Sequence, residues 1–296
     1  MRFFDNMVYQ GISHFMTLLG ALPLSLGKTT GRLLGVLWYV LDKKHRTLCL
    51  DNLENSYNGK KSKKEIRGLA NQVFQNTASM VFEHAWFHRL GAKRFLNHVT
   101  VSGLDNLTRA GEKGKGVICF SGHLGNWELA SCLPAVTGVP LATVYKTIEY
   151  PPLDRYVREK RSATGCVMLP LHNALDGIKE SLARGEHAGL FIDQNSRKRD
   201  QSVFIDFMGR TASANTGPAR LALSTKAPVI PVFIFKQKGR FFIDILPEVS
   251  LVETGDHEKD VAENTEAYHR IIENYVKKYP EQWFWIHNRW KTKPLK

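Results

Sequence analysis

The sequence is poor in cysteine, and its few cysteines form no recognisable motif. There are four, Cys49, Cys119, Cys132 and Cys166, and no two of them lie at CxxC spacing. This pattern predicts neither a zinc knuckle nor a disulfide framework, and it is typical of a reducing compartment. Internal repeats are also missing, and 43% hydrophobic with 23% charged residues excludes a disordered or collagen-like chain.

Acidic residues are scarce relative to basic ones. Lys and Arg total 41 against 28 Asp and Glu, which leaves a formal net charge of +13. Such a surplus predicts an anionic partner, which could be nucleic acid, a membrane surface or an acidic carrier protein. Because no known nucleic-acid-binding motif accompanies the charge, we expect no nucleic acid. A basic binding protein without catalysis is the alternative from a different functional class.

The front of the chain lacks charge, but it also lacks an unbroken apolar run. Residues 6–27 contain no Lys, Arg, Asp or Glu over about the ~20 residues that span a bilayer. Polar residues such as Gln10 and His14 interrupt this stretch, and Pro23 would kink a helix. We therefore expect residues 1–45 to form a helical membrane anchor, either transmembrane or interfacial. Two amphipathic helices packed on a soluble core are the alternative.

Basic residues follow this segment, whereas Arg2 and Asp5 cancel before it. By the positive-inside rule, the bulk of the chain is expected on the cytoplasmic side of an inner membrane. Residues 46–296 are expected to form a single α/β domain.

Short apolar runs alternate with helical patterns through this second region. Ser62 and Glu65 form a capping box that predicts a helix from Lys63 to about Leu90. The predicted strands are 99–101, 117–120, 141–145, 188–192, 229–235 and 241–246, and the predicted helices between them are 126–135, 153–164, 174–184 and 216–225. This alternation indicates an α/β fold with a central mixed sheet flanked by helices, closed by a hairpin at Lys238-Gly239.

Candidate chemistry lies where the predicted strand 117–120 meets the following helix. The junction reads SGHLGNWE from Ser121 to Glu128, at the end of a strand where open α/β sheets bind ligands. Asn126 is expected to cap the helix. Glu128, in the first turn, is expected to curl back and hold one ring nitrogen of His123, leaving the other as a general base. A purely structural His–Glu hydrogen bond is the alternative.

Other chemistries at this junction are excluded. Ser121 is a poor hydrolase nucleophile, because Cys119 stands where the G-x-S-x-G motif needs glycine. The HxxxxE pattern offers two side chains, too few for a zinc site. The GEKGKG segment at Gly111 precedes a strand instead of opening a helix, so it is no nucleotide-binding loop. A general base that activates a hydroxyl of the substrate remains, and we expect no metal or cofactor.

Several blocks of the chain resemble one family in the same order. HLGNWE at His123 is similar to the HxGNWE form of the H-x4-[DE] signature found in bacterial late lipid A acyltransferases, of the lysophospholipid acyltransferase superfamily. DNLENSY at Asp51, the block ending at Arg161 and Gly165, the DQ block at Asp193 and the closing YPEQWFWIHNRWK resemble further family segments. In two places the chain departs from them: Tyr57-Asn58 replaces Phe-Pro, and Met208 replaces a Phe.

The resemblance implies transfer of a fatty acyl chain from an acyl carrier protein or coenzyme A thioester to a lipid hydroxyl. The acceptor implied first is a lipid A precursor, an anionic membrane glycolipid, and a phosphatidylinositol mannoside or ornithine lipid is the alternative. His123 is implied as the base and Glu128 as its partner. Arg161, Asp193, Gln194, Gly125 and Asn126 are expected to line the substrate site.

Three further expectations concern groups around this site. Backbone N–H groups near Gly122–Gly125 are the physical candidates for stabilising an oxyanion. The basic run at Arg197, Lys198 and Arg199 is expected to meet acidic lipid or carrier protein, with a solvated loop as the alternative. The closing tryptophans are read as core packing.

Overall fold

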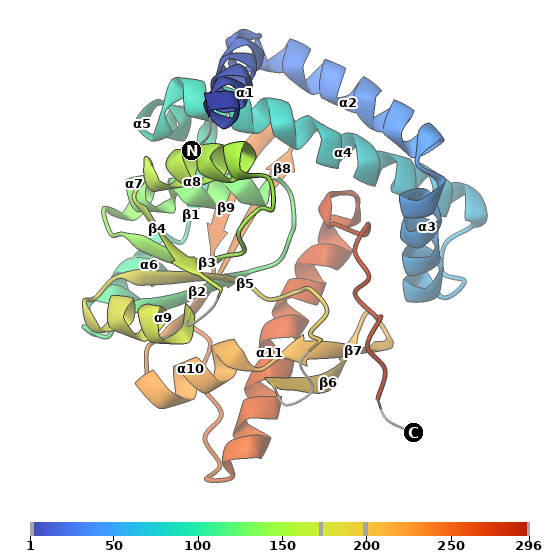
Figure 1. The fold of residues 1–296 in the computed structure, drawn as a ribbon. Coiled ribbons are helices and arrows are strands. Elements are labelled where there is room, and N and C mark those ends of the chain that lie inside the picture. Colours follow the sequence, from blue (N-terminus) through green and yellow to red (C-terminus); the bar gives the residue numbers. More distant parts are fainter. Residues whose placement is uncertain (1–2, 172–173, 198–200, 295–296) are drawn as a thin grey trace.

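The computed structural model describes residues 3–171, 174–197 and 201–294 (Figure 1). Seven strands form one sheet in the order β1-β9-β8-β2-β5-β3-β4. Neighbouring strands are parallel except β8 and β9, which are antiparallel. The strands are β1 (Val99–Ser102), β2 (Val117–Ser121), β3 (Leu141–Tyr145), β4 (Cys166–Pro170), β5 (His187–Phe191), β8 (Val229–Gln237) and β9 (Arg240–Ile245). The predicted central mixed sheet is confirmed.

The hairpin between β8 and β9 turns where the sequence predicts. Lys238 and Gly239 have φ of 49° and 79°, and Gln237 pairs with Arg240 on the opposite strand. Two consecutive residues with positive φ are what a tight two-residue hairpin turn requires.

Both faces of the sheet are buried. Ile118 and Phe120 of β2 point into one hydrophobic cluster, and Val117 and Cys119 point into the other. This alternation follows from the two-residue period of a strand and explains why β2 reads as an unbroken apolar run. A strand of this kind ends abruptly at its first polar residue, Ser121, so the chain leaves the core there.

Helices cover the two faces (Figure 1). The N-terminal helices lie above the sheet in that view, and the last helices lie below it. Their bounds are α1 (Phe3–Ala21), α2 (Leu24–Leu41), α3 (Lys43–Tyr57), α4 (Lys63–Leu90), α5 (Ala92–Phe95), α6 (Leu104–Gly111), α7 (Leu133–Thr137), α8 (Pro151–Ser162), α9 (Ala174–Ala183), α10 (Gly217–Thr225) and α11 (His257–Lys278). The capping box of Ser62 and Glu65 opens α4 as predicted, and Gly91 follows its last residue.

The expected membrane anchor is not supported. Within the described ranges, no helix is long and apolar enough to cross a membrane. Pro23 separates α1 from α2, and α2 packs along α4 through Gly27, Gly31 and Gly35. A Cβ at Gly35 would lie 2.4 Å from the Cα of Gln75, so the two helices are as close as their backbones allow.

Several elements differ from the sequence prediction, among them the helices α3 and α6, which were not predicted. Strand β4 was not predicted, nor was the separate hairpin of β6 (Ser202–Phe207) and β7 (Arg210–Asn215). The helix expected over residues 126–135 is instead a 3-10 segment, η2 (Trp127–Cys132), followed by α7. Pro134 explains the break, because proline favours the first turn of a new helix.

Candidate active site

His123 and Asp193 form a close pair at the carboxyl ends of two neighbouring strands. The Nδ1 atom of His123 lies 2.6 Å from Oδ1 of Asp193, and the His123 backbone N–H donates to Oδ2 at 2.8 Å. Strands β2 and β5 are parallel and aligned Ser121 to Phe191, so the residues that follow each strand meet at one edge. The sheet register therefore places the imidazole beside the carboxylate.

Asp193 is buried and remains ionised. Burial by itself raises the pKa of this carboxyl, because the charged form loses its hydration. The charge and hydrogen bonds of His123, together with the Trp283 indole N–H that donates at 2.6 Å, outweigh burial and hold the pKa well below its usual range. A carboxylate in this state orients the ring and stabilises an imidazolium.

The second ring nitrogen of His123 lies beside Gln194, and the histidine side chain is only partly buried. The side chain is 18% exposed, and its Nε2 lies 3.3 Å from Nε2 of Gln194. With the proton on Nδ1 toward Asp193, Nε2 is an acceptor, and the Gln194 amide donates to it. Aromatic rings of Trp127 and Phe191 flank the imidazole at centroid distances of 5.2 and 5.0 Å. This arrangement leaves a basic nitrogen in a largely apolar setting.

The expected partnership of Glu128 with His123 is wrong. Glu128 lies in η2, and its carboxylate accepts bonds from Nε and Nη2 of Arg161 at distances of 2.7 to 3.1 Å. Arg161 comes from the last turn of α8. The 3-10 geometry directs Glu128 toward α8, and Asp193 takes the ring nitrogen that the sequence assigned to Glu128. Arg161 and Glu128 thus form a fork-to-fork ion pair, with Nη1 of Arg161 unused by any described acceptor.

Asn126 neither caps a helix nor lines open surface. Its side chain is fully buried, and Nδ2 donates to the Met80 carbonyl and to Glu83 of α4. Glu83 is itself fully buried and pairs with the ammonium of Lys236 at 2.8 Å. A buried carboxylate needs such partners. The network ties the loop after His123 to α4 and β8.

The backbone N–H groups expected to hold an oxyanion are largely engaged. His123 donates to Asp193, Leu124 to the Gly122 carbonyl, and Gly125 to the Gln282 carbonyl. Gly125 has a φ of +60°, and a Cβ there would lie 2.3 Å from the Ile234 carbonyl oxygen. Gly125 is therefore required by close packing against β8.

The closing tryptophans are buried in the core, as predicted, and the C-terminal segment also contacts the candidate site. Besides the Trp283 bond to Asp193, the Phe284 N–H donates to the His123 carbonyl, and Leu124 and Trp283 form an isolated β-bridge. Arg289 is fully buried and donates to the Gln194 carbonyl at 3.4 Å. The tryptophans and arginines of this closing segment could have indicated such contacts in the sequence, because each carries hydrogen-bond donors that need a partner when they are buried.

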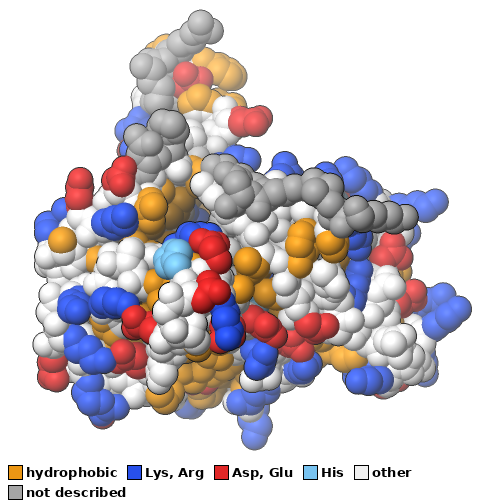
Figure 2. Space-filling view, turned by 90° about the horizontal axis from the view of Figure 1, so that it is seen from below, with side chains coloured by type: hydrophobic (Ala, Val, Ile, Leu, Met, Phe, Trp, Pro, Cys, Tyr) orange, Lys and Arg blue, Asp and Glu red, His pale blue; other side chains and the backbone are white. Residues whose placement is uncertain are grey.

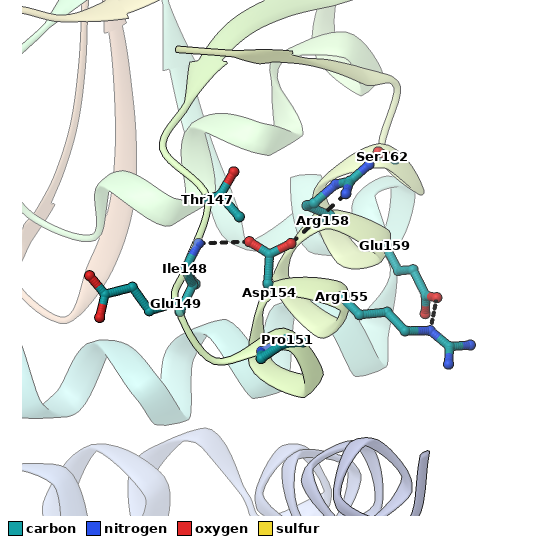
Figure 3. A pocket seen from close by; sticks show the side chains of 9 residues that line it. All are labelled: Thr147, Ile148, Glu149, Pro151, Asp154, Arg155, Arg158, Glu159 and Ser162. Atoms are coloured by element: carbon teal, nitrogen blue, oxygen red, sulfur yellow. Dashed lines mark hydrogen bonds and ion pairs between the residues drawn. The ribbon is translucent and has the colours of Figure 1, made fainter. Parts of the chain in front are cut away.

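A cavity of about 590 Å³ lies at the start of α8 (Figure 3). Figure 3 shows Arg158 beside Asp154, with which it forms an ion pair along α8, and Arg155 turned toward Glu159. The lining residues, from Thr147 to Ser162, do not include the histidine pair. Arg161 lies on the same helix, but neither Arg161 nor Glu128 lines the cavity.

Fold and site together define a class of enzyme. A histidine held by a buried carboxylate lies at the carboxyl ends of parallel strands in an α/β sheet, and all four cysteines are buried. An imidazole held in this way can act as a general base.

The family model for bacterial lipid A biosynthesis acyltransferases matches residues 7–292, and the chain belongs to this family. It is an acyltransferase. A lipid A biosynthesis acyltransferase of Haemophilus influenzae is 25% identical over 92% of this chain and 84% of its own length. A phosphatidylinositol mannoside acyltransferase of Mycolicibacterium smegmatis is 25% identical over 67% of this chain and 64% of its own length. A lipid A biosynthesis palmitoleoyltransferase of Escherichia coli is also 25% identical, over 66% and 62%.

Proposed function

We propose that this enzyme transfers a fatty acyl chain from an acyl thioester to a hydroxyl of a lipid A precursor. The single observation that carries the mechanism is the His123–Asp193 pair, with one ring nitrogen held and the other presented to the site. The family membership supports acyl transfer as the reaction class.

His123 acts first as a base. Its Nε2 removes the proton of the acceptor hydroxyl while the hydroxyl oxygen attacks the thioester carbonyl carbon. The tetrahedral intermediate then collapses, the carbon–sulfur bond breaks, and the proton passes from the imidazolium to the departing thiolate. An ester and a free thiol result. Asp193 is a positioning residue that stabilises the imidazolium throughout.

Gln194 lies where the incoming hydroxyl must bind. Its amide donates to His123 Nε2 at 3.3 Å, a long bond that a substrate hydroxyl can replace. Once displaced, the amide remains beside the reacting atoms as a hydrogen-bond partner for the acceptor. We therefore propose that Gln194 contacts the acceptor, whereas the buried Asp193 acts on it only through His123.

Arg161 is proposed to bind negative charge during the reaction. Two of its three guanidinium nitrogens hold Glu128, which fixes the plane of the group, and Nη1 is left for a phosphate or a developing negative charge. The role proposed for Glu128 is therefore to position Arg161. Removal of Glu128 is expected to alter the binding of the anionic acceptor more than the chemical step.

The acceptor is proposed from the relatives and the charge. Two of the relatives named above are lipid A enzymes, and their acceptor class is anionic like the partner that a net charge of +13 favours. Another glycolipid, of the phosphatidylinositol mannoside type, is the second candidate, because a relative with that activity is also 25% identical, over 67% of this chain. The donor is proposed as an acyl carrier protein or coenzyme A thioester, without a cofactor or metal.

Residues 1–45 are proposed to rest on a membrane surface. Large apolar side chains of α1 and α2 are exposed, among them Phe3 at 82%, Leu18 at 69% and Leu33 at 66%. The opposite end, seen from below in Figure 2, carries positive and negative side chains interspersed. Amphipathic helices with exposed apolar rows lie in the interface of a bilayer without crossing it. We place this surface at the cytoplasmic face of the inner membrane.

The reaction is tested with purified protein in detergent, a panel of labelled acyl thioesters and a panel of lipid acceptors. Ester formation on a lipid A precursor supports the proposal, and His123→Ala should lower transfer by at least ~100-fold. Lipid profiles of a deletion strain separate the two acceptor candidates. A normally acylated lipid A in that strain would overturn the leading acceptor.

A further inference from the structure

A cationic cleft lies at the end of the loop that carries Asp193. It has a volume of about 400 Å³ and is lined by Arg197, Lys291, Thr292, Lys293 and Pro294. The three cations are exposed, and within residues 3–171, 174–197 and 201–294 no carboxylate is paired with them. Lys198 and Arg199, which continue the basic run in the sequence, lie outside the described residues. None of the residues that line this cleft takes part in the mechanism proposed for His123.

Hydrogen bonds hold the two walls of this cleft together. Nδ2 of Asn195 donates to Oγ1 of Thr292 at 3.0 Å, and the Thr292 N–H donates back to Oδ1 of Asn195 at 3.1 Å. Oγ1 of Thr292 also donates to the Ser196 carbonyl at 3.0 Å. These hydrogen bonds hold Arg197 on one wall of the cleft opposite Lys291 and Lys293 on the other, so three positive charges line the same cleft.

The cleft is within a short reach of the reacting histidine. Arg197 is four positions after Asp193, so their Cα atoms are at most roughly 14 Å apart at ~3.5 Å per residue. The acyl carrier protein and coenzyme A present their thioester on the same phosphopantetheine arm, which has two amide units between its phosphate and its sulfur. That arm is about as long as a four-residue peptide. A thioester at His123 therefore brings the phosphate to the distance of the cleft.

The position of the cleft fits a donor that arrives from water. In Figure 1 the C-terminal segment runs past β7 at the lower right, whereas the apolar helices α1 and α2 lie at the top. Resting on the proposed function, we propose that Arg197, Lys291 and Lys293 bind the phosphate of the phosphopantetheine arm of the acyl donor. Arginine and lysine side chains are the usual ligands of phosphate groups.

The test compares donors that differ only in the phosphate. Acyl-phosphopantetheine carries it, and an acyl thioester of N-acetylcysteamine does not. The triple variant Arg197→Gln, Lys291→Gln, Lys293→Gln should lower the ratio of kcat/KM for the first donor over the second by tenfold or more. Tenfold corresponds to about 1.4 kcal/mol. Acyl carrier protein and coenzyme A thioesters, assayed in parallel, should both show the loss, because both carry the phosphate.

A matched control removes the same charge elsewhere. Lys60, Lys63 and Lys64 are exposed in the turn before and the first residues of α4, and their triple change to Gln should leave the donor ratio as in the wild type. An equal fall in the control would assign the effect to net charge and overturn the proposal.

Three other results would also overturn the proposal. These are an unchanged ratio, a rise confined to the KM of the lipid acceptor, and a loss seen only with the carrier protein. The last two would assign the cations to lipid phosphate or to an acidic protein surface. Calorimetry with free phosphopantetheine needs no acyl transfer, so intact phosphate binding in an inactive enzyme would contradict the proposed function alone.

Discussion

Replacing Asp193 with Asn tests the central pair most directly. The substitution keeps the size of the side chain but removes the charge that lies 2.6 Å from Nδ1 of His123. For charge centres ~4 Å apart at an effective dielectric constant of ~20, the lost attraction to the imidazolium is about 4 kcal/mol. A barrier higher by that amount lowers the rate by roughly a thousandfold.

The assay is acyl transfer over a pH series, with kcat and KM measured separately. We expect kcat to fall by about a thousandfold, because the imidazolium exists only during the reaction, while the KM values for donor and acceptor change little. Matching thermal unfolding of the variant and the wild type would show that the fold is retained.

The matched comparison is Glu128→Gln, which removes the other carboxylate of the site. Glu128 holds Arg161 and not His123, so this variant should raise the KM of the anionic acceptor and leave the shape of the pH profile unchanged. The reasoning is refuted if Asp193→Asn retains activity within about fivefold while Glu128→Gln loses a thousandfold.

Three more substitutions probe the frame around the site. Gly125→Ala should lower the free energy of unfolding by at least ~2 kcal/mol and abolish transfer, because its Cβ would meet the Ile234 carbonyl; a stable, active variant would contradict this. Glu83→Gln should lower the free energy of unfolding, measured by chemical denaturation, by about 3–5 kcal/mol, because it leaves Lys236 buried without a counter-charge. Adding Lys236→Met should recover part of this loss, and no recovery would argue against the ion pair. Burial, with neighbouring positive charge, lowers the pKa of His88 to about 3, below the unfolded value of ~6.5, so the protein loses stability as the pH falls below ~6.5. His88→Asn should therefore reduce the fall in the free energy of unfolding between pH 7 and pH 5 by about 2 kcal/mol, measured by urea titration. An unchanged fall would count against this role of His88.

The regular parts of the fold were predictable because their signals are local. The α4 helix begins at a capping box of adjacent residues, and β2 and β8 read as continuous apolar runs. The β6–β7 hairpin was not predicted because its residues are only partly apolar, with Ser202, Arg210 and Thr211 among them, and the apolar run of β4 is only five residues long and ends at Pro170. Pairing across a sheet, not local preference, makes such segments strands.

The sequence named the residues of the candidate site but not the contacts among them. His123 contacts Asp193 and Gln194, and Glu128 contacts Arg161, whereas the sequence alone assigned Glu128 to the imidazole. A spacing of five residues suggests a local pairing. The actual partner is 70 residues away, and only the parallel register of β2 and β5 brings it close.

The segment around Trp283 and Phe284 has a consequence for biosynthesis. These residues leave the ribosome 160 or more positions after His123, which at ~5–20 residues per second is a delay of roughly 8–30 s. Until Trp283 has been synthesised, Asp193 lacks the indole N–H that donates to it, and Leu124 lacks its bridge partner in the C-terminal segment. The growing chain is thus expected to be inactive in acyl transfer until this segment has been synthesised. A ribosome-stalled product ending before Trp283 should show no ester formation, and a working one would disprove this timing.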